Sequence, residues 1–500
     1  MIGTRSKTFS LAFLAGLLAR AAFAAAPAMP PSTWAQKNEM RAGWVVGWRQ
    51  MTSPKGIDDA VAWAEKARLN ALFVQVRVSG DAYYQSDLVP RAETLKNQPV
   101  DFDPLAYMLK KAHAKGMKVH AWFNTGVIWR GLTPPVSPQH VFNAHPEWIL
   151  KDASGRVAFP RSDDPKPSVV EGNVWVEWAN PELRAHLAAA AAELVERYPV
   201  DGLHYDFVRY PARMGPRTPG VGYDPASVAL FKKETGHMPV EHERAWDEWR
   251  EAQVGAGLRA IHDAVKAKRP GVEVSAAVLA AWSLAEGRNM TAYRRWTDAG
   301  ILDFAVLMSY FPDPSWIQQS LLNAVETLDP RRVVAGYSVK AHTPERVAEQ
   351  LDWSRSAALR GWALFSLDRD ETPDPDAYLA RLRALAIPDA ADTRYASREP
   401  LWIRVGVLDA TNQSWTLRFY SRRGRARIIV YPRGAEAASF SVEGATIPVR
   451  FDGEKPFEAD LTPYLKPFAR ETAANHDYLL SATLRGAGSA QVFIVDSYGD

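Results

Sequence analysis

The stretch that decides the fold runs from residue 71 to residue 124. It holds a strand-like run, "ALFVQVRV" (71–78), then an amphipathic stretch, "DPLAYMLKKAHAKG" (103–116), then a second strand-like run, "MKVHAWFN" (117–124). A helix between two such strands predicts a parallel pair, because the chain must cross back before a second strand can run in the same direction. This stretch therefore predicts an α/β fold.

The same alternation recurs along the chain. The strand-like runs are at 41–48, 71–78, 117–124, 200–207, 272–279, 302–310, 331–339 and 359–368, and helical stretches separate them. Eight such units suit a (β/α)₈ barrel of the TIM type, which commonly spans 200 to over 400 residues. A doubly wound open sheet is the alternative. No glycine-rich phosphate loop follows the first strand, which weakens that alternative. We assign residues 40–390 to the barrel.

The pattern changes after about residue 390. Short apolar runs such as "LWIRVGVL", "ARIIVYP" and "AQVFIVDS" follow one another, and turn signals separate most of them. Short strands without intervening helices are typical of antiparallel sheets. Residues 395–500 are therefore predicted to form a separate β-sandwich domain.

The N-terminus has the layout of an export signal. Arg5 and Lys7 precede an apolar run at 10–19, and small residues follow at 22–26. This order predicts a signal peptide over residues 1–26, a mature chain that begins near Ala25, and a linker at 27–39. No later segment reaches the roughly 18 apolar residues that a membrane span requires. The mature protein is expected to be secreted or periplasmic.

Composition excludes several classes of function. The formal net charge is only +3, from 60 basic and 57 acidic residues, and no long basic run indicates a nucleic-acid partner. The chain has no cysteine, so disulfides, thiolate metal sites and cysteine nucleophiles are excluded. The 18 Trp, 17 Tyr and 19 Phe residues suggest that some rings line a groove for a ring-shaped ligand.

The stretch "VDGLHYDFVRYP" (200–211) carries an acid at the end of a predicted strand. Side chains alternate between the faces of a strand, so Gly202, His204 and Asp206 share the face that points into the barrel. Asp206 then lies at the C-terminal end of the strand, where barrel enzymes hold their chemistry. Asp201 lies at the opposite end and on the other face, and we interpret it as structural.

Polar and aromatic residues end the other strands as well. The predicted barrel brings the ends of all eight strands to one rim, so these side chains are expected to gather there. We predict substrate-binding roles for Arg77, Asp81, Tyr84, His120, Trp122, Asn124, His204, Arg209, Tyr310 and Tyr337.

Several motifs in this order resemble a known family. They are "RAGWVVGW", "GDAYYQSDLVP", "DPLAYMLKKAHAKGMKVHAWFN", "HPEWILKDASG", "NPELR" and "VDGLHYDFVRYP". Together they resemble the glycosyl-hydrolase-like family 10, also called the DUF187 group, over about residues 40–370. The resemblance implies a barrel and glycan chemistry, since the family includes a hydrolase of peptidoglycan glycan strands. Several members carry two consecutive acids where this chain has Asp206 and Phe207, so only Asp206 matches that motif.

Glycoside hydrolysis usually requires two carboxyl groups. We predict Asp206 as nucleophile or base, because Arg77, His204 and Arg209 would keep it charged. Asp368, at the end of the last barrel strand, is the predicted partner. Further candidates for the partner are Asp81, Glu286 and Asp313, and Trp282 is a further ring that could stack on a sugar.

Two other functions remain open at this point. A barrel that has lost one acid would bind glycans without cleaving them. A metal-dependent deacetylase would use His120, His204 and Asp206 as ligands, although no compact pair of histidines occurs at a strand end. The preferred prediction is an exported glycoside hydrolase that acts on a cell-envelope or extracellular polysaccharide without a metal or another cofactor.

Overall fold

The computed structural model describes residues 39–500 except for 132, 152–172, 212–221, 281–290, 313–316, 318–319, 322–323, 326–327, 358, 370–373, 388–401, 410–412, 421–425, 466–476, 486 and 497–500. The predicted signal peptide, almost all of the linker, and Trp282, Glu286 and Asp313 therefore lie outside the described residues. In the part that is described, no helix combines the length and apolar character that crossing a bilayer requires.

The predicted barrel is confirmed. Eight parallel strands close on themselves in the order β1-β10-β9-β8-β7-β6-β3-β2. They are β1 (Met40–Val45), β2 (Ala71–Arg77), β3 (Lys118–Asn124), β6 (Gly202–Asp206), β7 (Glu273–Leu279), β8 (Phe304–Met308), β9 (Val333–Ser338) and β10 (Gly361–Phe365). The first strand ends earlier than predicted, because Gly47 begins a short helix, α1 (Gly47–Gln50).

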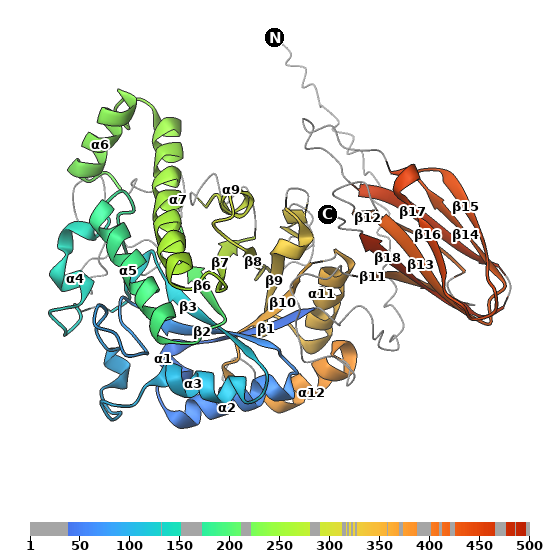
Figure 1. The fold of residues 1–500 in the computed structure, drawn as a ribbon, viewed down its shortest axis with the longest axis horizontal. Coiled ribbons are helices and arrows are strands. Elements are labelled where there is room, and N and C mark those ends of the chain that lie inside the picture. Colours follow the sequence, from blue (N-terminus) through green and yellow to red (C-terminus); the bar gives the residue numbers. More distant parts are fainter. Residues whose placement is uncertain are drawn as a thin grey trace, which may run out of the picture. The chain divides into compact units, whose positions relative to one another are not determined.

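Helices surround the strands (Figure 1). The longer ones are α2 (Pro54–Lys66), α3 (Pro104–His113), α5 (Pro181–Arg197), α6 (Pro225–Thr235), α7 (Glu243–Lys268), α11 (Pro344–Ser356) and α12 (Pro375–Ala386). All of these except α7 begin with a proline after a Ser, Asp, Asn or Thr whose side chain accepts a hydrogen bond from the first turn. A side-chain cap followed by proline is a strong helix start, so the sequence fixes where each of these helices begins.

The long connection between β3 and β6 carries smaller elements. They are the paired strands β4 (Val127–Trp129) and β5 (Val174–Trp175) and the short helix α4 (Val141–Ala144). A further short helix, α9 (Tyr293–Asp298), precedes β8.

The barrel interior is filled by side chains. Gly202 leaves room for a ring on β3, since a β-carbon there would collide with His120. His120 and His204 are fully buried in this interior with Phe73 between them, in contact with both rings. The barrel is thus a packed core below its C-terminal rim.

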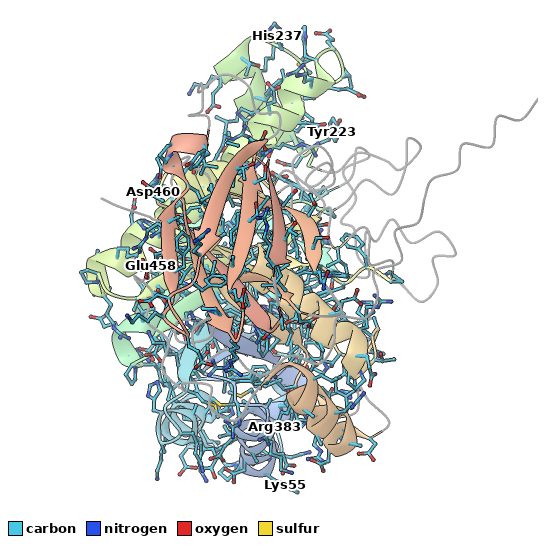
Figure 2. The ribbon with its side chains drawn as sticks, turned by 90° about the vertical axis from the view of Figure 1, so that its right-hand side faces the viewer. Lys55, Tyr223, His237, Arg383, Glu458 and Asp460 are labelled. Carbon is cyan, nitrogen blue, oxygen red and sulfur yellow. The ribbon has the colours of Figure 1, made fainter. Side chains whose placement is uncertain are left out.

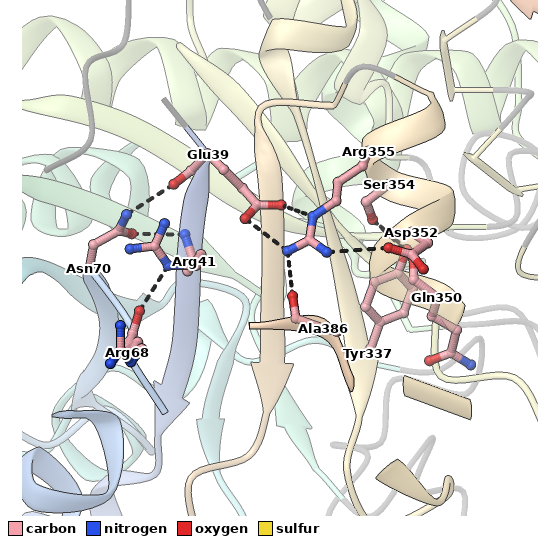
Figure 3. A network of polar contacts seen from close by, with 10 residues as sticks. All are labelled: Glu39, Arg41, Arg68, Asn70, Tyr337, Gln350, Asp352, Ser354, Arg355 and Ala386. Atoms are coloured by element: carbon pink, nitrogen blue, oxygen red, sulfur yellow. Dashed lines mark hydrogen bonds and ion pairs between the residues drawn. The ribbon is translucent and has the colours of Figure 1, made fainter. Parts of the chain in front are cut away.

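A network of charged residues lies where β1 begins (Figure 3). Glu39 forms an ion pair with Arg355 of α11 at 2.8 Å, and Arg355 also donates to the carbonyl of Ala386 at 2.9 Å. Asn70 donates to the carbonyl of Glu39 at 2.9 Å, which joins this network to the start of β2. The network links the first residues of the barrel to its last two helices.

The C-terminal region forms two antiparallel sheets, ordered β11-β18-β13-β16 and β12-β17-β14-β15. Their strands are β11 (Trp402–Leu408), β12 (Ser414–Tyr420), β13 (Ala426–Arg433), β14 (Ala437–Val442), β15 (Ala445–Arg450), β16 (Phe457–Asp460), β17 (Asp477–Arg485) and β18 (Ser489–Asp496). One apolar cluster takes side chains from both sheets, as a sandwich requires. Edge strand β16 presents Glu458 and Asp460 at the surface (Figure 2). The sequence predicted this change of architecture.

Candidate active site

A cavity of about 400 Å³ opens at the C-terminal ends of the barrel strands. Asp206, Leu279, Met308 and Phe365 are the last residues of four of these strands, and all four line it. The other lining residues are Trp44, Trp48, Gln75, Trp122, Arg130, Phe207, Arg209, Ala277, Ala280, Tyr310 and Phe311. This is the end of the barrel at which barrel enzymes carry their active sites.

Asp206 is held rigidly at this end. One carboxylate oxygen accepts a 2.6 Å hydrogen bond from the backbone N–H of Phe207. The Asp206 carbonyl accepts from the backbone N–H of Thr125 at 2.9 Å and from its hydroxyl at 2.8 Å. Phe207 has a φ of 56°, which is unusual for a residue with a side chain. A β-carbon on Gly126 would collide with the Phe207 carbonyl, so the backbone after β3 supports this turn closely.

The environment of Asp206 makes it a weaker acid than usual. Its exposed fraction is 7%. Burial raises the pKa of Asp206 to about 6, although the Phe207 N–H and the charges of Arg209 and Arg130 act in the opposite direction. The carboxylate is therefore mainly ionised at neutral pH and protonated in mild acid.

Aromatic rings form much of the cavity wall. Tyr310 stacks on Phe365 with ring centres 5.1 Å apart, and Trp44 meets both rings edge to face at 6.3 Å and 5.8 Å. Burial and the charge of Asp206 raise the pKa of the Tyr310 hydroxyl well above its usual value, so it remains protonated. Trp48 is 39% exposed and gives the cavity an accessible ring. Flat apolar rings beside a carboxylate suit the faces of a sugar.

His204 lies beneath this wall. Its Nε2 accepts a 3.2 Å hydrogen bond from the Trp44 indole N–H, so its Nδ1 carries the proton and donates to the Ser275 hydroxyl at 2.9 Å. Burial lowers the pKa of His204 well below its usual value. Because both nitrogens are occupied, His204 supports Trp44 rather than contacting substrate, and it does not suit a metal ligand. Elsewhere in the described chain, no three His, Asp or Glu side chains cluster as a metal site would require.

Four predicted residues come together in the cavity: Asp206, Trp122, Arg209 and Tyr310. His120 does not reach it, because it lies deeper in the barrel against Phe73 and Phe304. Burial lowers the pKa of His120 to about 4, so this ring is a neutral part of the core.

Arg77 differs from its prediction because the strand is irregular. Strict alternation would place Arg77 on the same face as Gln75, but the pairing of β2 with β3 shifts register between these two residues. Arg77 therefore points out of the barrel, where its guanidinium lies over the Phe123 ring and donates to the Asn124 carbonyl. Gln75 keeps the inward direction and lines the cavity.

The neighbours of Arg77 are also structural. Asp81 accepts from the backbone N–H of Ser79 at 2.9 Å, and the Asn124 side chain donates to the Val78 carbonyl at 2.6 Å. Tyr84 packs edge to face on Tyr198 with ring centres 5.9 Å apart. None of Asp81, Asn124 and Tyr84 lines the cavity.

Tyr337 and Asp368 lie outside the cavity too. The Tyr337 hydroxyl is 2.6 Å from the Ser354 hydroxyl of α11 (Figure 3), so its ring faces the helices. Asp368 pairs with Arg49 at 2.8 Å and does not line the cavity. Tyr337 thus faces the helices, and Asp368 is engaged by Arg49.

Sequence reasoning missed several lining residues. Trp44 shares the inward face of β1 with Ala42. The alternation of side chains in "RAGWVVGW" is enough to predict this direction for Trp44. Arg130 lies just after β4, in an insertion without a periodic pattern, and no sequence signal marks it. Phe207 stands where several family members carry a second acid, and its ring forms part of the cavity wall.

The chain is similar in sequence to a known protein family and to named relatives. The family model described as Glycosyl hydrolase-like 10 matches residues 39–352. Glycosyl hydrolase DigH of Escherichia coli K12 is 25% identical over 330 residues, which are 57% of this chain and 68% of that protein. Glycosyl hydrolase YngK of Bacillus subtilis is 26% identical over 265 residues, 51% of this chain and 44% of that protein.

Among solved structures, α-L-fucosidase isoenzyme 2 from Paenibacillus thiaminolyticus matches with a TM-score of 0.49 and 15% identity, over 70% of this chain and 49% of that chain. The family model covers more than half of the chain, including every barrel strand up to β9. The chain belongs to the glycosyl hydrolase-like 10 family.

Proposed function

We propose that the protein is an exported glycoside hydrolase that cleaves O-glycosidic bonds of a cell-envelope or extracellular polysaccharide, with peptidoglycan glycan strands as the first substrate to test. The observation that carries the proposal is the buried carboxylate of Asp206 in a ring-lined cavity at the C-terminal end of the barrel. The names of the relatives DigH and YngK agree with this activity.

Asp206 acts as nucleophile or base in this proposal. Its pKa of about 6 leaves it ionised at neutral pH, as both roles require. The cation-like sugar that develops in the transition state is stabilised by a carboxylate that the Phe207 N–H holds in place. Tyr310 stays protonated beside it and can donate a hydrogen bond to the substrate. Activity governed by Asp206 rises as the pH increases through about 6.

Hydrolysis also requires a general acid, which is usually a second carboxyl group. Asp206 is the one carboxylate among the cavity-lining residues that the structure describes. Asp313 follows the lining residue Phe311 by two positions, and Glu286 follows the lining residue Ala280 by six, so both are retained as candidates. Asp368 becomes a weaker candidate, because Arg49 already neutralises its charge.

That the described cavity wall holds a single acid also favours the second candidate function, a glycan-binding protein without turnover. The experiment that separates the two compares the wild type with Asp206→Asn on purified glycan strands, with product analysis by mass. No cleavage by either form would favour the binding protein. The hydrolase proposal expects turnover to fall by at least 10²–10³-fold while the fold persists, because a charge used in the transition state is lost. Wild-type turnover in the variant would show that Asp206 is not catalytic.

The matched control is Asp201→Asn, directly before the strand that ends at Asp206. Asp201 accepts from the Val119 N–H and from His113, each at 2.8 Å, outside the cavity. Asp201→Asn should lower the free energy of unfolding and leave turnover per folded molecule unchanged.

N-terminal sequencing of the exported protein tests the signal peptide. The mature chain should begin near Ala25, and intact Met1 on exported protein would contradict the signal peptide.

A further inference from the structure

A short segment of the chain braces the turn that follows Asp206. The turn is residues 207–210, and the bracing segment is residues 175–178, which start at the last residue of β5. The backbone N–H of Val176 donates to the Gly126 carbonyl at 3.0 Å. The bracing segment is therefore anchored to the loop after β3, and that loop lies directly against the turn.

Two side chains of the bracing segment contact side chains of the turn. The Trp175 ring meets the Phe207 ring edge to face with ring centres 5.5 Å apart. The guanidinium carbon of Arg209 lies 4.7 Å from the centre of the Trp175 ring. Glu177 accepts a hydrogen bond from the Tyr210 hydroxyl. These contacts hold the turn along its length.

The contact made by Trp178 differs from these, because it reaches the backbone of the turn. The Trp178 indole N–H donates to the Arg209 carbonyl at 3.1 Å, and the Trp178 side chain is fully buried. Helix α7 lies against the ring, since a β-carbon on Gly257 would be only 2.8 Å from it. Trp178 thus links a long helix to the peptide that follows the catalytic strand.

The turn in its own right determines how the Asp206 carboxylate is held. The Arg209 N–H donates to the Phe207 carbonyl at 2.8 Å, and the Phe207 N–H donates to the carboxylate at 2.6 Å. Phe207 has a φ of 56°, a value that a residue with a side chain keeps only where its surroundings hold it. A continuous series of contacts therefore runs from Trp178 to the carboxylate.

We propose that Trp178 is a positioning residue, whose indole N–H holds the Arg209 carbonyl and so fixes the turn that orients the Asp206 carboxylate for catalysis. Trp178 does not line the cavity, so its effect on turnover passes through the turn. A catalytic group that is displaced by about 1 Å can lose about 10²-fold in rate. The inference rests on the proposed glycan hydrolysis at Asp206.

A role limited to packing would give a different result. A buried tryptophan that only fills space contributes to the free energy of unfolding and leaves the ionisation of Asp206 unchanged. Burial raises the pKa of Asp206 to about 6, while the Phe207 N–H and the charge of Arg209 act against burial. A loosened turn weakens both opposing effects, so the pKa of Asp206 should rise further. Among the described residues, Arg130 and Tyr310 also interact with the Asp206 charge, and both stay in place.

The experiment compares Trp178→Phe with Trp362→Phe. Both positions are fully buried and lose the same side-chain volume, but the Trp362 N–H has no acceptor among the described residues. Only Trp178→Phe therefore removes a hydrogen bond. For each variant, kcat and KM are measured on purified glycan strands as a function of pH. The titration of Asp206 is measured without substrate, from the difference in free energy of unfolding between each variant and the same variant carrying Asp206→Asn.

Trp178→Phe should lower kcat about 10- to 100-fold at pH 7 and change KM by less than about 2-fold. The acid limb of the kcat profile and the substrate-free titration of Asp206 should both move upward by about 0.5–1 pH unit, as expected when a hydrogen bond to the ionised form weakens. Trp362→Phe should lose similar stability and keep the wild-type kcat and titration.

A second form of position 178 separates the hydrogen bond from the packing. In 3-benzothienylalanine a sulfur atom replaces the indole N–H and the shape of the ring is nearly kept. This residue, incorporated in place of Trp178, should give the same shift with little loss of stability. It also decides the question if circular dichroism shows that Trp178→Phe does not fold.

An unchanged kcat and titration in the benzothienyl form would overturn the inference, and so would equal effects of Trp178→Phe and Trp362→Phe. The proposed function is judged separately. A shifted Asp206 titration, without turnover of any glycan by the wild type, would refute hydrolysis and leave the bracing of the turn in place. Turnover by the wild type, with no shift in the variants, would refute only the positioning role of Trp178.

Discussion

The indole N–H of Trp44 on β1 donates to Nε2 of His204 on β6, 3.2 Å away through the barrel interior. The histidine ring is itself fixed, because it stacks on Phe73 with ring centres 4.1 Å apart and donates to Ser275. A buried residue that does not line the cavity thereby sets the position of a ring in the cavity wall.

Replacing His204 by Phe should disturb substrate binding through Trp44. The ring stays on Phe73, but the Trp44 N–H and the Ser275 hydroxyl lose their partner, which costs roughly 1–3 kcal/mol of unfolding free energy. KM should rise more than kcat falls, and tryptophan fluorescence should change. Tyr337→Phe is the control, because it removes a buried hydroxyl contact on the outer face and should leave KM unchanged. If His204→Phe and Tyr337→Phe have equal KM and kcat values, His204 does not position Trp44 for substrate binding.

Asp206→Asn should stabilise the protein while it abolishes activity. Burial raises the Asp206 pKa from 3.8 to about 6 in the folded state. The carboxyl group therefore contributes stability below pH 3.8 that is lost as the pH increases through about 6. At pH 7 the ionised group costs up to about 3 kcal/mol, since one pKa unit corresponds to about 1.4 kcal/mol. Urea unfolding should show a higher free energy of unfolding for the variant than for the wild type at pH 7, and equal values below pH 4. A variant that is less stable than the wild type at pH 7 would contradict this account.

Glu177 makes stability depend on pH in a second place. It is buried, one oxygen accepts from the Tyr210 hydroxyl, and burial with the nearby charge of Asp224 raises its pKa from 4.5 to about 8, against the opposing charge of Arg250. Its stabilising contribution is complete below pH 4.5 and disappears as the pH increases through about 8.

Glu177→Gln should therefore flatten the dependence of stability on pH between 5 and 8. The amide still accepts from Tyr210, but it cannot ionise. The wild type should lose on the order of 3–5 kcal/mol more than the variant over this interval, measured by urea unfolding at several pH values. Parallel curves for the two proteins would show that Glu177 is ionised throughout.

The two parts of the chain are predicted to fold independently. Residues 40–390 hold the barrel strands, and the apolar cluster of the C-terminal sheets draws its side chains from residue 408 onward. Separate expression of 40–390 and 395–500 should give two cooperative unfolding transitions, and the barrel fragment should keep its turnover. If neither fragment folds, the proposed boundary is wrong.

The fold could be predicted because its signal is periodic. Each barrel strand is a short apolar run, and six of the longer helices begin with a capping side chain followed by proline. The direction of Asp206 followed from the same alternation, since β6 pairs regularly with β3 along its whole length.

The site was less predictable, because the alternation of side chains no longer predicts their direction where a strand becomes irregular. One shift of register turned Arg77 outward while Gln75 remained inward. Tyr337 was predicted to bind substrate because it lies near the end of a strand. The alternation of side chains along β9 instead points it toward α11. Arg130 comes from an insertion with no period at all, so only the folded chain brings it near Phe207.

Gly126 has a consequence for how activity screens of this protein are interpreted. It does not line the cavity, yet any side chain there would push on the Phe207 carbonyl and so displace the residue beside Asp206. A mutational scan scored by turnover would rank position 126 with the reacting groups, whereas a scan scored by glycan affinity would separate them. Loss of function at a glycine 80 positions upstream of Asp206 would then report on backbone shape and carry no information about chemistry.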